Sequence, residues 1–216
     1  MSIDALGAIL AGGRSLRMGT DKALVPVGGV PMIEWVAAAL RAVVDEVVVV
    51  GRDGGLAGVP ALPDLRPGPR GPLPGLAAAL RHAAGRPVLL VAVDQPLVRP
   101  ATLRGLAGLL GRRAVIPVDR GVRQTTCAAY PAAWTEAADV EDAAGGSIQS
   151  LLDRLPHREV ALAEWTAWGE DGRSWYSVDT PEAAAAVLGR YEGSAPVTPA
   201  GPGDGPPPRR GSRATA

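Results

Sequence analysis

Short apolar runs of strand length alternate along the first half of the chain with longer segments whose apolar residues recur at helical spacing. The runs at 6–10, 46–50 and 88–93 are built mainly from Val, Leu, Ile and Ala, as in strands buried on both faces. The segments 31–43 and 73–84 between them carry apolar residues along one helical face. This alternation predicts βαβ units, and we therefore expect an α/β fold in three layers around a mainly parallel sheet.

Less regular elements follow in the second half of the chain. The expected elements are helices at 100–110, 147–155 and 181–191 and strands at 114–117 and 124–130. In open parallel sheets, ligands bind beyond the carboxyl ends of the strands. The loop after Leu10 and the carboxylate of Asp94 both follow apolar runs, so both are expected at that edge.

The last residues have a different composition from the rest. From residue 193 onward the chain is dominated by Gly, Pro, Ser, Ala and Arg, which cannot bury enough apolar surface to order itself. We expect one folded domain at 1–192 and a disordered tail at 193–216. An inert tail and a basic interaction tail both remain open.

Charge and cysteine content exclude several classes of protein. The 216 residues carry 22 basic and 22 acidic side chains, so a general binder of nucleic acid or of anionic membranes is not expected. The single cysteine, Cys127, excludes an intramolecular disulfide and a Cys/His zinc site and favours a cytoplasmic protein. The apolar runs are far shorter than the roughly 20 residues of a membrane-spanning helix.

One lysine remains among the basic residues. Lys22 is the only lysine, every other basic residue is arginine, and the chain has no asparagine. An ammonium group is a compact point charge, whereas a guanidinium is broad and planar. The one lysine in a chain that otherwise uses arginine therefore indicates a position where a guanidinium cannot replace an ammonium group.

The loop LAGGRSLRMGTDK, residues 10–22, combines flexible glycines with basic side chains. Backbone N–H groups of such a turn form an anion-binding concavity, and Arg14, Arg17 and Lys22 add positive charge, so the loop suits a triphosphate. It matches neither the P-loop nor the dinucleotide-binding fingerprint. From the residues alone, a glycine-rich surface loop with solvated arginines remains an alternative. Asp94, after a buried run, is well placed to hold Mg²⁺ over phosphates.

This loop and the segments after it resemble nucleotidyltransferases with a Rossmann-like fold, and within that group molybdenum cofactor guanylyltransferases. The similar segments, spread over about residues 5–190, are LAGGRSLRMGTDK, PDLRPGPRGPLPGLAAAL, VAVDQPLVRP, TTCAAY, SIQSLLDRL and VDTPEAAAAV. The resemblance implies transfer of GMP from Mg²⁺-bound GTP to the phosphate of the molybdenum cofactor (molybdopterin), with release of pyrophosphate. It also leaves molybdoenzyme maturation proteins open as partners.

The resemblance assigns roles to individual positions. The backbone of the LAGG turn would contact the nucleotide, Lys22 would lie between phosphate oxygens and Asp94 would bind the metal. The turn comprises Leu10, Ala11, Gly12 and Gly13. Arg17 would neutralise triphosphate charge, although a surface salt bridge explains it nearly as well.

Two further aspartates have alternative explanations. Asp64 matches a nucleotide-contacting aspartate, but it also suits a turn beside prolines. Asp179 is a further candidate for the metal or the acceptor site. It directly precedes a helix start in which Thr180 is suited to cap and Pro181 to open the helix.

The chain departs from its relatives after the second apolar run. Familiar members have a nucleotide-contacting asparagine there, whereas this chain has only Gly51, Arg52 and Asp53. Familiar cytidylyltransferases tend to have LAAG where this chain has LAGG, so Gly12 favours guanine. A sibling transferase that uses CTP or a sugar phosphate, and a nucleotide-binding protein without catalysis, remain alternatives.

Overall fold

A seven-stranded sheet forms the middle of the molecule. The computed structural model describes residues 1–12, 21–62 and 71–190, so the expected tail at 193–216 lies outside the described residues. The strand order is β4-β1-β5-β8-β6-β7, and β9 pairs with β6. The strands are β1 (Ile3–Leu10), β4 (Val44–Val50), β5 (Val88–Ala92), β6 (Ala114–Asp119), β7 (Val122–Arg123), β8 (Cys127–Tyr130) and β9 (His157–Val160).

The strand directions confirm a mainly parallel sheet. β1 runs parallel to both β4 and β5, with Gly7 opposite Val47 on one side and Leu89 on the other. β8 is antiparallel to β5 and to β6, so β6 and its parallel neighbour β9 again point the same way as β1. The strand expected at 124–130 begins only at Cys127, and β9 was not predicted from the sequence.

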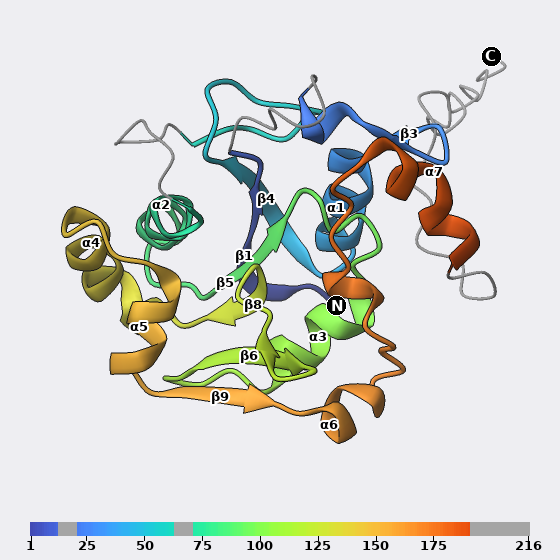
Figure 1. Cartoon of the computed structure of the whole chain (residues 1–216). Coiled ribbons are helices and arrows are strands. Elements are labelled where there is room, and N and C mark those ends of the chain that lie inside the picture. Colours follow the sequence, from blue (N-terminus) through green and yellow to red (C-terminus); the bar gives the residue numbers. More distant parts are fainter. Residues whose placement is uncertain (13–20, 63–70, 191–216) are drawn as a thin grey trace, which may run out of the picture.

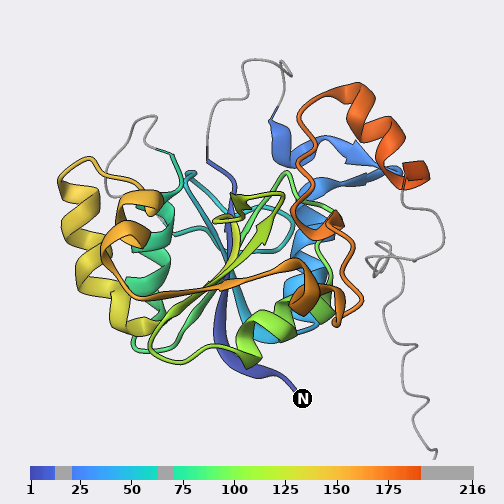
Figure 2. The same ribbon diagram turned by 60° about the horizontal axis from the view of Figure 1, so that its bottom comes forward.

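Helices cover both faces of this sheet, as Figures 1 and 2 show. One face carries α2, α4 and α5, and the other carries α1, α3 and α6. The helices are α1 (Met32–Arg41), α2 (Leu73–Ala83), α3 (Pro100–Gly108), α4 (Thr135–Ala143), α5 (Ile148–Arg154), α6 (Leu162–Thr166) and α7 (Pro181–Arg190). Within the described ranges, none of them is both long and apolar enough to cross a bilayer. The three-layer α/β prediction is confirmed.

Each face has its own apolar core. Ile33 and Leu40 of α1 pack with Leu103 and Leu106 of α3 on one side, all without exposed surface. Leu76 and Leu80 of α2 pack with Leu151 of α5 and with buried Tyr130 on the other side. Helix α4 has no clear periodic signal in the sequence, because it is short and acidic and only Ala138 among its apolar residues is fully buried.

A third apolar cluster fixes the segment before α7. Val178 is completely buried and packs with Trp35 of α1 and with Val27 of the hairpin β2 (Pro26–Val27) and β3 (Val30–Pro31). The indole N–H of Trp35 donates to the carbonyl of Val27 at 3.0 Å. This packing holds residues 177–179 beside the first turn that follows the glycine loop.

Candidate active site

Lys22 begins a short 3₁₀ helix, η1 (Lys22–Leu24), at the carboxyl edge of the sheet. The carboxylate of Asp21 caps this helix by accepting from the backbone N–H of Ala23 at 3.1 Å. Ala23 is buried in the core beneath it. The backbone of Lys22 is therefore anchored on both sides, which limits where its long side chain can reach.

The ammonium of Lys22 lies between two carboxylates. Its Nζ is 2.6 Å from Oδ2 of Asp94 and 2.7 Å from Oδ1 of Asp179. The side chains of Lys22 and Asp94 are only 17% and 24% exposed, whereas that of Asp179 is 65% exposed. Burial opposes the charge, but the hydrogen bonds to Asp179 and Asp94 outweigh it and hold the pKa of the Lys22 ammonium above its usual value.

Asp94 is joined to the C-terminal segment by two hydrogen bonds. It follows the end of β5 by two residues, and its Oδ2 accepts from the hydroxyl of Ser177 at 3.0 Å. Its backbone carbonyl accepts from the N–H of Val178 at 2.8 Å. Ser177 and Asp94 are 83 positions apart in the sequence, and Ser177 was not predicted as a site residue. Only its place two residues before Asp179 could have suggested it.

The cap of α7 is Thr180, as expected. Its hydroxyl accepts from the backbone N–H of Ala183 at 3.1 Å, and Pro181 is the first residue of the helix. The structure thus brings the carboxylate of Asp179 to Lys22 and Asp94, while its neighbour serves the helix start. The capping role thus falls to Thr180, whereas the carboxylate of Asp179 contacts the Lys22 ammonium.

The end of β1 lies directly against the end of β4. The backbone N–H of Ala11 donates to the carbonyl of Val50, and the carbonyl of Leu10 accepts from Val93 after β5. A Cβ on Gly12 would lie 2.4 Å from the carbonyl oxygen of Gly51, so no side chain fits there. Backbone packing therefore explains the glycine at position 12 without reference to the nucleotide. As a result, the LAGG pattern is only weak evidence for guanine.

The remaining candidates divide into two groups. Gly13, Arg17 and Asp64 lie outside the described residues. Arg52, which follows the end of β4 by two residues, donates from Nη1 to Oδ2 of Asp21 at 2.8 Å. The described part of the site therefore consists of the glycine turn, the Lys22 cluster and this arginine pair, all at the carboxyl ends of β1, β4 and β5.

Comparison with known proteins identifies the family of the chain. Residues 7–160 match the model of the MobA-like NTP transferase domain. A molybdenum cofactor guanylyltransferase of Xanthomonas euvesicatoria pv. vesicatoria is 36% identical over 179 residues, which is 82% of this chain and 90% of that protein. The chain belongs to the MobA-like NTP transferase family. The resemblance found from the sequence is thereby confirmed, and the chain is a nucleotidyltransferase.

Two further similarities support membership of this NTP transferase family. A probable molybdenum cofactor guanylyltransferase of Pelotomaculum thermopropionicum is 47% identical over 105 residues. That match spans 47% of this chain and about half, 51%, of the relative. The crystal structure of molybdopterin-guanine dinucleotide biosynthesis protein A from Archaeoglobus fulgidus superposes with a TM-score of 0.74 at 25% identity, over 86% of this chain and 100% of the other.

The donor set of the Lys22 cluster suits a hard divalent cation. Asp94 and Asp179 offer carboxylate oxygens to the same point, and such oxygens are the ligands that Mg²⁺ prefers. No group of three or more acidic, His or Cys side chains suited to a metal occurs within the described residues. Mg²⁺ usually binds to one or two carboxylates and completes its shell with substrate phosphates and water, so two protein oxygens suffice.

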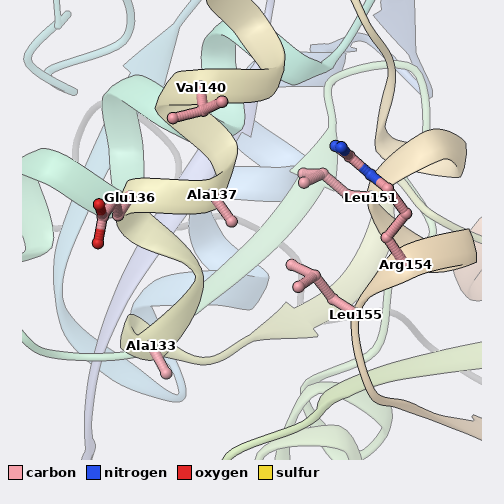
Figure 3. A pocket seen from close by; sticks show the side chains of 7 residues that line it. All are labelled: Ala133, Glu136, Ala137, Val140, Leu151, Arg154 and Leu155. Atoms are coloured by element: carbon pink, nitrogen blue, oxygen red, sulfur yellow. The ribbon is translucent and has the colours of Figure 1, made fainter.

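A groove elsewhere on the molecule is not part of this site. It has a volume of about 360 Å³ and lies between α4 and α5, on the face of the sheet opposite α1 (Figures 1 and 3). It is lined by Ala133, Glu136, Ala137, Val140, Leu151, Arg154 and Leu155. Its walls are mostly apolar, and it contains none of the residues that gather around Lys22.

Proposed function

We propose that the chain transfers GMP from Mg²⁺-bound GTP to the phosphate of the molybdenum cofactor, releasing pyrophosphate and forming the guanine dinucleotide form of that cofactor. The observation that carries the proposal is the Lys22 ammonium held between Asp94 and Asp179, beside the glycine turn. The names of the relatives from Xanthomonas and Archaeoglobus support the choice of nucleotide and acceptor. The cytoplasm is the proposed compartment.

The reaction is a single in-line displacement. A phosphate oxygen of the acceptor forms a bond to the α-phosphorus of GTP, and the bond from that phosphorus to the oxygen bridging to the β-phosphate breaks. Both electrons of the broken bond leave with pyrophosphate. The reaction needs no covalent enzyme intermediate, so the contribution of the protein is positioning and charge neutralisation.

Each residue of the cluster has a part in that displacement. The turn at 10–12 brings backbone close to the nucleotide, and the Lys22 ammonium can move from its two carboxylates onto phosphate oxygens as negative charge develops there. Asp94, with Asp179 beside it, would hold Mg²⁺, which supplies Lewis-acid neutralisation of the triphosphate when bound. Ser177 keeps the Asp94 carboxylate oriented through its 3.0 Å hydrogen bond.

The nucleotide and the acceptor are tested together by pyrophosphate release. We expect release when the chain is given GTP, Mg²⁺ and molybdenum cofactor, and much slower release when CTP replaces GTP. Faster release with CTP would assign the chain to a cytidylyl sibling. GTP binding without pyrophosphate release from any acceptor would instead support a nucleotide-binding protein without catalysis. Omission of the acceptor is the blank for both arms.

Lys22→Arg tests whether the single lysine is required. A guanidinium keeps the charge but spreads it over a plane, so it cannot occupy the single point that Nζ shares with Asp94 and Asp179. We expect kcat for pyrophosphate release to fall by roughly 100-fold, the scale of one lost charge-stabilising group. Arg41→Lys, in which an exposed arginine on α1 is exchanged, is the control. Full activity of folded Lys22→Arg would contradict the role.

A further inference from the structure

The side chain that follows the carboxyl end of β4 is turned toward the protein. Arg52 is only 22% exposed, and its Nη1 donates to Oδ2 of Asp21 at 2.8 Å. Its Nε is out of contact with solvent and has no acceptor among the described residues. The Arg52 guanidinium is thus partly buried although Asp21 lies at the surface, and among the described residues the ion pair with Asp21 is its hydrogen-bonded contact.

Asp21, the partner of Arg52, is held from two sides. While Oδ2 accepts from Arg52, Oδ1 accepts from the N–H of Ala23 and caps the 3₁₀ helix whose first residue is Lys22. Each oxygen of the carboxylate therefore has its own donor, one from the Arg52 side chain and one from the backbone. Because Asp21 and Lys22 are consecutive, a change in the backbone dihedral angles of Asp21 also moves the Cα and Cβ atoms of Lys22.

A continuous chain of contacts therefore joins two strands of the sheet. It runs from Arg52 after β4, through the carboxylate of Asp21 and the backbone of Lys22, to the carboxylate of Asp94 after β5. We propose that Arg52 is a positioning residue, which through Asp21 sets the place of the Lys22 ammonium between Asp94 and Asp179. We call the contacts from Arg52 through Asp21 to Lys22 the clamp. Its role in catalysis rests on the proposed transferase activity, but its effect on the position of the Lys22 ammonium does not.

The first experiment measures the clamp through activity. Asp21→Asn keeps an oxygen that can cap Ala23 but removes the charge that binds Arg52, and Arg52→Met removes the other partner. We expect each variant to lower kcat for pyrophosphate release by roughly tenfold, with KM for the acceptor little changed, and the double variant to be no slower than either. Arg41→Met, at an exposed arginine that donates to the carbonyl of Gly58, should leave kcat unchanged. Independent, multiplying effects of the two substitutions would overturn the proposal.

The second experiment needs no turnover, because the chain contains one lysine. Growth on ¹³C,¹⁵N-lysine labels Lys22 alone, and the Cε–Hε chemical shifts report its place between the two carboxylates. In nucleotide-free protein we expect these shifts to move toward those of an unfolded chain in both Arg52→Met and Asp21→Asn, and to stay constant in Arg41→Met. Unmoved shifts in folded variants would overturn the clamp. If the wild-type protein is inactive but the shifts of the variants change as expected, the proposed function is excluded and the clamp is retained.

Discussion

Asp94→Asn should abolish transfer and leave the fold intact. The amide has the shape of the carboxylate and still accepts from Ser177, and the backbone bond from Val178 is untouched, so the structure is retained. The charge that faces Lys22, and would face Mg²⁺, is lost. Because the reaction proceeds by charge neutralisation, we expect kcat for pyrophosphate release to fall by about 1,000-fold or more.

Matched measurements separate this effect from misfolding. The melting temperature and near-ultraviolet circular dichroism of Asp94→Asn should stay close to those of the wild type. Asp139→Asn removes an aspartate that pairs with Arg81 of α2, on the face of α4 and α5, and should release pyrophosphate at the wild-type rate. A folded Asp94→Asn protein with wild-type turnover would exclude Asp94 from the reaction.

Glu170→Ala should cause the largest loss of stability among the changes considered. Glu170 is only 3% exposed, and its carboxylate accepts from the hydroxyls of Thr102 and Ser174. The backbone N–H groups of Asp171, Gly172 and Ser174 also donate to it, at 3.0, 2.8 and 3.3 Å. Removing the acceptor leaves buried donors unpaired, and we expect the free energy of unfolding to fall by about 3 kcal/mol or more.

Urea denaturation measures this loss, with Glu170→Gln as the graded comparison. The amide retains one oxygen for the backbone N–H groups, and the hydroxyls can rotate to accept from its NH₂, so a smaller loss is expected. Asp153→Ala, at an exposed aspartate that lies 3.5 Å from Arg123, should leave the midpoint almost unchanged. A wild-type midpoint for Glu170→Ala would show that the network contributes nothing. The carboxylate also binds the backbone of residues 171–174, which lead to Ser177 and Asp179.

Much of the scaffold was predictable because it depends on local pattern. Buried runs such as 88–93 and amphipathic segments such as 73–84 became β5 and α2 with small shifts at their ends. The missed elements have weak local signals. β9, with the sequence HREV, has only Val160 fully buried, and the direction of β8 is not encoded in its own apolar pattern.

The candidate site was predictable only where a residue has its own signal. Lys22 is the single lysine, and Asp94 follows a buried run, so both were identified. Arg52 and Ser177 carry no comparable signal, since arginine and serine are common at loops. Their importance depends on partners that lie 31 and 83 positions away in the sequence.

The sequence by itself determined the strand–helix alternation, the neutral single-lysine composition and the glycine turn, because each is a property of neighbouring residues. Only the tertiary structure decided that Asp179 faces Lys22, that Gly12 packs against Gly51 and that Glu170 accepts from Thr102. These three contacts join segments that are remote along the chain. They form only when the sheet and the hairpin of β2 and β3 fix the course of each segment. The local periodicity of the sequence does not encode that course.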